Sequence, residues 1–161
     1  MKNKIVIILV LLSNVVFGQK GFNLNFGSGI LTIKDNSGFN FDVGATYDIS
    51  NKVGIYTNYN YSELNLKNFD ENSNFNRFQF GGYYKLLNNS TQISSLVGFS
   101  VISANDVVLF DRKTTIGTDL GLLLLFEADK KFNYGIKWIN SFTPSSIGGI
   151  MQANICFNYR L

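Results

Sequence analysis

Histidine is absent from this 161-residue sequence, and cysteine and proline occur once each. Without histidine there is no Ser-His-Asp or Cys-His catalytic site, no histidine general base and no histidine-containing zinc site. A single cysteine excludes an internal disulfide and a cysteine zinc cluster. Charged residues are also scarce, at 16%, whereas 45% of the residues are hydrophobic and 15% are aromatic. These absences remove much catalytic chemistry, and the length suits one domain.

The beginning of the sequence has the layout of a secretory signal peptide. Lys2 and Lys4 precede an unbroken apolar run over 5–12, which is too short to cross a bilayer as a helix. We therefore expect residues 1–19 to be a cleaved signal peptide and residues 20–161 to form the mature domain. Removal of the two lysines leaves 12 of the 14 basic residues against 11 acidic ones, so the mature charge favours no nucleic-acid partner.

The mature chain alternates between apolar and polar residues throughout, which is the pattern of half-buried strands. No window shows the apolar spacing of an amphipathic helix. The alternation predicts eight strands, at 21–34, 38–49, 53–65, 76–86, 92–103, 113–127, 132–142 and 149–161. Short connections rich in Asn, Asp, Ser and Gly require hairpins, so neighbouring strands must be antiparallel. The expected fold is all-β, an eight-stranded antiparallel up-and-down transmembrane β-barrel.

The apolar face of these strands is almost free of charge. Only Lys34 and Glu63 carry a charge there, and both lie at strand ends. A lysine or arginine on the lipid-facing midplane of a barrel costs about 2–4 kcal/mol and much less near the interfaces. The distribution of charge therefore predicts that the apolar face contacts lipid and that the polar face lines the lumen.

The polar face carries four positive and four negative side chains among glycine and small polar residues. They are Asp42, Asp48, Arg77, Lys85, Asp119, Glu127, Lys137 and Arg160. We expect them to form a structural charge network in the lumen, in which Asp119 and Lys137 pair across neighbouring strands. Asp42 and Asp119 could in principle act as a catalytic acid-base pair, but we favour their role in the structural charge network.

Two further features concern the lumen. Cys156 is expected to fill space there as a small buried side chain. Leu123 and Leu125 interrupt the alternation, since they too point inward, and they predict a local apolar plug near the periplasmic end.

The closing segment GIMQANICFNYRL, together with the signal peptide and the eight alternating strands, resembles the small eight-stranded outer-membrane barrels of the OmpA/OmpX type. In that family the last strand ends in alternating apolar residues that the barrel-assembly machinery recognises. Here Ile155, Phe157, Tyr159 and Leu161 take those places, with Leu161 where phenylalanine is commoner. The resemblance implies location in the bacterial outer membrane, contact with its lipid and with the assembly machinery, and a role in anchoring, envelope integrity, adhesion or ligand contact.

The leading hypothesis is a small outer-membrane barrel with a lumen filled by side chains, which serves a structural, adhesion or binding role through outer loops around 66–75 and 104–112. No enzymatic activity, cofactor or metal is expected. Two alternatives remain open at this point: a narrow solute pore, and a soluble secreted barrel that binds a small apolar ligand as lipocalins do.

Overall fold

The structure is a computed structural model that describes residues 21–66, 72–104, 113–144 and 148–161. The predicted signal peptide at 1–19 lies outside the described residues, as do the parts of the predicted outer loops at 67–71 and 105–112. No helix in the described ranges is long and apolar enough to cross a membrane.

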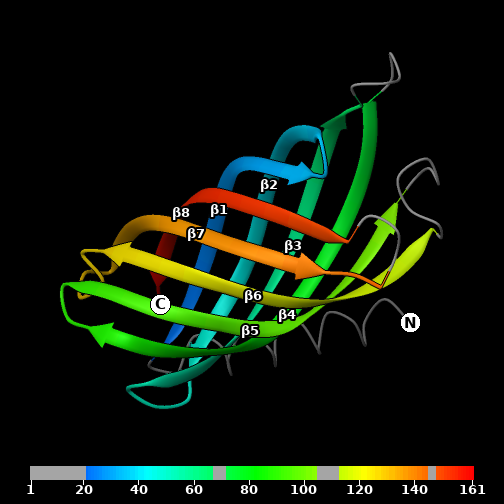
Figure 1. The fold of residues 1–161 in the computed structure, drawn as a ribbon. Coiled ribbons are helices and arrows are strands. Elements are labelled where there is room, and N and C mark those ends of the chain that lie inside the picture. The colour runs from blue at the N-terminus through cyan, green and yellow to red at the C-terminus, as the bar shows by residue number, and fades with distance from the viewer. Residues whose placement is uncertain (1–20, 67–71, 105–112, 145–147) are drawn as a thin grey trace, which may run out of the picture.

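Eight strands form a single closed barrel in which each strand pairs antiparallel with its neighbours in the chain (Figure 1). The strands are β1 (Phe22–Ile33), β2 (Asn36–Asp48), β3 (Val53–Asn65), β4 (Asn72–Asn88), β5 (Thr91–Ala104), β6 (Thr114–Phe126), β7 (Phe132–Phe142) and β8 (Gly149–Arg160). The predicted fold class and all eight strands are confirmed. The largest difference is in β4, which begins at Asn72 rather than at 76, because 72–75 continue the pairing with β3.

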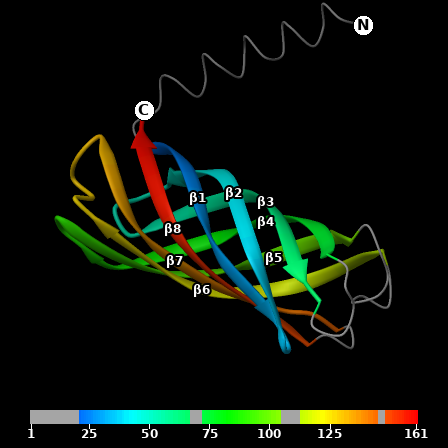
Figure 2. The same cartoon turned by 90° about the horizontal axis from the view of Figure 1, so that it is seen from above.

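The barrel closes where β8 pairs with β1, so that Leu24 lies opposite Tyr159 and Ile33 opposite Ile150 (Figure 2). Both ends of the described chain and the β2–β3, β4–β5 and β6–β7 turns lie at one end of the barrel, called the termini end below. The β1–β2 turn and the other connections lie at the opposite end, called the remote end. The β1–β2 turn contains only Lys34 and Asp35, and Lys34 has a left-handed backbone with φ of 51°.

Side chains alternate between the outside and the inside along every strand, as a pleated backbone requires. Glu63 is the one charged side chain that points outward from the described strands. Large apolar side chains dominate the outside; Ile30, Ile116 and Ile155 are each more than 60% exposed. The interior contains the buried polar residues, so the barrel is apolar outside and polar inside.

Candidate functional site

The lumen contains a polar middle with an apolar cluster on either side, and further polar side chains lie at the termini end. The polar middle contains buried Asn, Gln, Ser, Asp, Lys and Arg side chains from β2 to β8. Because little bulk water reaches this region, each polar group needs a partner within the barrel. The residue pairs that satisfy this need define the site.

Asp42 and Lys137 form a buried ion pair across the lumen, from β2 to β7. Asp42 is 0% exposed and Lys137 is 5% exposed. Asn154 on β8 donates a second hydrogen bond to the same carboxylate. The predicted pairing of Lys137 with Asp119 is wrong, because in the β6–β7 ladder Lys137 lies opposite Leu123 and Asp119 lies opposite Ser141. The two residues therefore lie four positions apart along the barrel.

Asp119 accepts two hydrogen bonds that come from side chains on β4 and β5. Gln79 Nε2 lies 2.9 Å from one carboxylate oxygen, and Ser100 Oγ lies 2.9 Å from the other. Asn60 donates to Gln79 over 2.8 Å, and Gln152 on β8 donates to Asn60 over 3.0 Å. This chain of contacts joins β3, β4, β5, β6 and β8 around one buried carboxylate.

Arg77 on β4 is 0% exposed and lies in the same layer. Its Nη1 donates to Ser141 Oγ over 2.9 Å. Its Nε and Nη2 have no hydrogen-bond partner among the described residues. Arg77 is therefore attached to the network through one donor, while its charge is offset by the two nearby carboxylates, Asp119 and Asp42.

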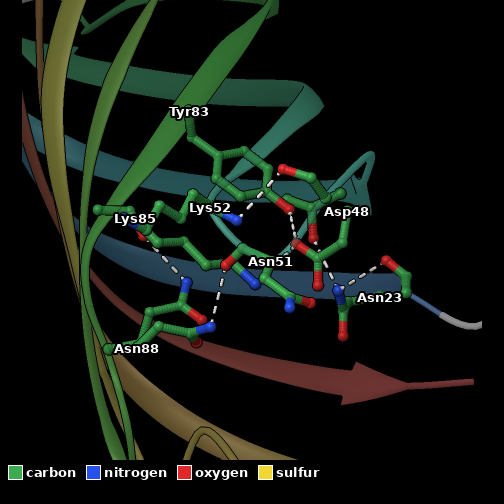
Figure 3. Close-up of polar contacts among 12 residues, drawn as sticks. Asn23, Asp48, Asn51, Lys52, Tyr83, Lys85 and Asn88 are labelled. Atoms are coloured by element: carbon green, nitrogen blue, oxygen red, sulfur yellow. Dashed lines mark hydrogen bonds and ion pairs between the residues drawn. The ribbon is translucent and has the colours of Figure 1, made fainter.

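A second ion pair lies at the termini end of the lumen (Figure 3). Lys85 Nζ on β4 lies 2.8 Å from Asp48 Oδ1 on β2, and the Tyr83 hydroxyl donates to the same carboxylate. Figure 3 shows the Tyr83, Lys85 and Asp48 side chains converging beside Asn23 of β1. These contacts tie β2 and β4 together where the barrel opens, and Asn23 Nδ2 adds β1 through a hydrogen bond to Thr46 Oγ1 over 3.2 Å.

Two of the predicted lumenal charges differ from this pattern. Glu127 is exposed and pairs with Lys130 over 2.6 Å in the β6–β7 turn, so its predicted place in the lumen is wrong. The reason is local, because Glu127 follows β6 with a left-handed backbone, φ 55°, which ends the alternation. Arg160 is half-buried at the termini end, where its Nη2 donates to the carbonyl of Ala128 over 3.0 Å.

Apolar clusters flank the polar middle. The termini-end cluster contains Tyr56, Tyr83, Leu96, Leu123, Leu125, Ala128, Ile139 and Cys156. The predicted inward positions of Leu123 and Leu125 and the predicted burial of Cys156 are therefore confirmed. The remote cluster contains Leu31, Ile33, Leu64, Phe75, Ile102, Ala104 and Ile150. Sequence reasoning missed the remote cluster, although its signal was present: the inward positions near the remote ends of five strands change from polar to apolar.

Glycines bring the walls of the lumen close to its side chains. A Cβ atom at Gly27 would lie 2.2 Å from Asp42 Oδ1, and one at Gly135 would lie 1.9 Å from the carbonyl oxygen of Leu124. Two small cavities near the termini-end cluster have volumes of about 20 Å³ each. A cavity of that size has room for a water molecule but not for an organic ligand.

The chemistry available to this arrangement is limited. Asp42 and Asp119 are both fully buried and saturated with side-chain partners, and they lie between the apolar clusters. In the described ranges no three His, Cys, Asp or Glu side chains come together in a way that suits a metal ion. The contacts can hold strands in register and exclude solvent.

Comparisons with known proteins identify the fold. No protein-family model matches the sequence, and no curated protein matches it. Among solved structures, Neisserial surface protein A has a TM-score of 0.65 at 9% identity, with 87% of this chain and 96% of that chain covered. The outer membrane enzyme PagL has a TM-score of 0.59 at 13% identity, with coverage of 86% and 99%. The Yersinia pestis outer membrane protein Ail has a TM-score of 0.56 at 14% identity, with coverage of 89% and 100%.

The closed eight-stranded barrel and its almost uncharged, apolar exterior define the class of fold: this chain has the fold of a small outer-membrane β-barrel. Its fold is that of the OmpA/OmpX type, as the sequence predicted. An exterior of this kind suits contact with the hydrocarbon of a bilayer.

Proposed function

We propose that this protein is a closed, non-enzymatic barrel that presents a binding or adhesion surface at its remote end. The termini end faces the periplasm in this proposal, and the remote end faces outward. The observation that carries the proposal is the layered lumen, in which a hydrogen-bonded polar middle lies between two apolar clusters. A barrel closed in this way acts through its ends, because the two cavities near the termini-end cluster measure only about 20 Å³ each.

The remote ends of β3 and β4 support a contact surface at that end. Outward-facing side chains there are polar rather than apolar: Glu63, Asn65, Asn72, Asn74 and Asn76. Two hydrogen bonds order them, from Asn72 to Glu63 over 2.9 Å and from the Tyr59 hydroxyl to Asn76 over 2.7 Å. A polar outer face does not suit lipid, so this part of the hairpin belongs in water. In Figure 1 it reaches the upper right of the barrel.

The solute-pore and lipocalin-like alternatives both need open space in the lumen. An eight-stranded barrel has an interior just wide enough for side chains to fill. The cavities of about 20 Å³ agree with that limit. An enzymatic role is disfavoured for a different reason. The chain has no histidine, and its two candidate acid-base carboxylates, Asp42 and Asp119, are buried.

Export and assembly complete the proposal. The N-terminal segment directs export and is cleaved after Gly18 or Gln19, so that intact-mass measurement of the membrane protein gives a chain starting at Gln19 or Lys20. Retention of Met1 would contradict this. The alternating Ile155, Phe157 and Tyr159 on the outside of β8 present the assembly signal to the barrel-assembly machinery.

Planar-bilayer recording and a surface-binding assay test the proposal together. The purified barrel should give no steady ion current. Cells that display a variant with 66–71 and 105–112 replaced by short turns should keep normal barrel levels but lose adherence to a panel of immobilised glycans and matrix proteins. A stable current would establish the pore instead, and unchanged adherence of the loop variant would remove the remote end as the binding surface.

A further inference from the structure

A groove runs over the outside of β2, β3 and β4. Its volume is about 450 Å³, and its floor and walls are almost entirely apolar. Outward-facing Ala45 and Thr57 lie side by side across the β2–β3 ladder and form the floor, because both side chains are small. Larger side chains surround them: Phe22, Tyr47, Ile55 and Phe80.

Gly82 lies beside the groove, next to the lining residue Gly81. It faces outward on β4, opposite Ile55 of β3. An added Cβ there would meet only one atom within 4 Å, the carbonyl oxygen of Gly54 at 3.6 Å. The neighbouring Gly81 differs, since its Cβ would lie 2.2 Å from a backbone oxygen of β5. Packing within the barrel therefore explains the glycine at 81 but not the one at 82.

The turn between β2 and β3 adds a positive charge to the same hairpin. Lys52 is exposed there, and it forms no ion pair with any residue in the part of the chain that the structure describes. Thr57 lies five residues further along the hairpin, which corresponds to about 17 Å of strand. With a strand tilt of about 40°, the separation along the membrane normal is about 13 Å. Half of a hydrocarbon core is about 15 Å thick.

We propose that this groove binds one acyl chain of an anionic phospholipid whose phosphate lies against Lys52. The groove is continuous with the lipid-facing exterior, so its occupant comes from the membrane rather than from water. An acyl chain suits it because the floor is apolar and the walls are rings and branched chains that pack against methylene groups. The separation of about 13 Å between Lys52 and Thr57 along the membrane normal allows the lipid phosphate to lie at Lys52 while the acyl chain of the same lipid lies over Thr57.

The single tryptophan of the sequence, Trp138 on β7, provides an internal control. It faces outward, 37% exposed, on a strand remote from the groove. A second reporter comes from Phe80→Trp combined with Trp138→Phe, since Phe80 is a wall of the groove and is 49% exposed. Each protein is reconstituted in phosphatidylcholine vesicles that contain a low mole fraction of brominated phosphatidylglycerol, and quenching of the tryptophan fluorescence is measured. Heat-dependent migration on SDS gels verifies that every variant is folded.

Brominated phosphatidylglycerol should associate with the reporter at 80 about fivefold more strongly than with Trp138, which is the gain expected from one lysine near an anionic lipid. Lys52→Gln should abolish the difference. Lys131→Gln is the matched control, because Lys131 lies at the same end of the barrel on the β6–β7 hairpin and contacts the Tyr159 ring; it should leave the difference intact. Ala45→Leu, which fills the groove and keeps Lys52, should also remove the difference.

Equal quenching at 80 and 138 would overturn the proposal. A preference for the reporter at 80 that survives Ala45→Leu would also overturn the proposal, since contact between the lipid phosphate and Lys52 would then explain the binding without the groove. Weak quenching at 80 by brominated phosphatidylcholine and phosphatidylglycerol alike would show that a second copy of the chain covers the groove instead.

Discussion

The polar middle of the lumen and the remote apolar cluster lie next to each other, but they stabilise the barrel in different ways. In the polar middle each buried carboxylate has particular partners: Asp42 has Lys137 and Asn154, and Asp119 has Gln79 and Ser100. In the remote cluster, the apolar side chains share nondirectional contacts. Loss of one polar partner leaves a buried charge, whereas loss of one methyl group leaves a small void. The polar middle should therefore fix strand positions, and the remote cluster should exclude water.

Deletion of residues 157–161 should have the largest effect, because it breaks the β1–β8 pairing that closes the barrel around both regions. Phe157 and Tyr159 of β8 pair with Phe26 and Leu24 of β1. Without these pairs the barrel cannot close, and unpaired backbone groups are not tolerated in lipid. Immunoblots of the outer membrane should show the deleted chain lost to degradation.

The matched control for this deletion is Leu161→Phe, which introduces the terminal residue that is commoner in the OmpA/OmpX-type barrels. This variant should accumulate normally in the outer membrane. Normal membrane levels of the deleted chain would show that the last five residues are dispensable for closure.

Lys137→Met should be the most damaging single substitution in the polar middle. It leaves Asp42 buried without its cation, at a cost of about 3–5 kcal/mol in the free energy of unfolding. Adding Asp42→Leu should recover much of that loss, since both charges are then gone. Urea unfolding in lipid vesicles measures the three variants against the wild type.

Asp119→Leu distinguishes the pairing in the structure from the pairing that the sequence predicted. Combined with Lys137→Met it should give roughly the sum of the two single effects, because Asp119 makes its hydrogen bonds elsewhere. A full rescue by Asp119→Leu instead of by Asp42→Leu would overturn the observed pairing.

The remote cluster should tolerate a comparable change in size far better. Ile102, which is 0% exposed, loses one methylene group in Ile102→Val, at a cost of about 0.5–1.5 kcal/mol. The same urea titration measures it. A loss as large as that of Lys137→Met would contradict the contrast between the two regions.

Lys130→Ala tests an ion pair outside both regions and should have the smallest effect. The hydrogen bond from Lys130 to Glu127, together with the negative charge of Glu127, raises the pKa of the exposed Lys130. A raised pKa in the folded state stabilises the fold below the unfolded pKa of about 10.4, and this contribution is lost as the pH rises through the folded pKa. Between about pH 6 and pH 9 this contribution is present but small, because exposed pairs contribute little, so the wild type and the variant should unfold at nearly the same urea concentration.

Strand alternation predicted most of the fold, because a barrel between lipid and a polar lumen imposes a period of two on every strand. The start of β4 was missed since Asn72, Ser73 and Asn74 have the composition of a loop. In the structure Asn72 and Asn74 point outward at the remote end, where the strand carries polar residues on its outer face. Local composition does not distinguish such a strand from a turn.

The contacts inside the lumen were harder to predict. Alternation predicts which side chains point inward, but it does not predict which of them meet across the barrel. Lys137 and Asp42 are on β7 and β2, which are not neighbours in the sheet. Their contact depends on the stagger of strands around the closed barrel, a property of the whole chain. Reasoning from adjacent strands therefore selected Asp119.

The pairing of β1 with β8 also determines when this protein can fold. The first and last strands of the chain are neighbours in the barrel, with Asn23 opposite Arg160. Because β1 is synthesised first and β8 last, closure of the barrel waits until β8 is available. Closing so long a loop is slow, and the alternating apolar residues remain exposed in the meantime. The connectivity of the barrel therefore imposes an interval during folding in which aggregation competes with closure.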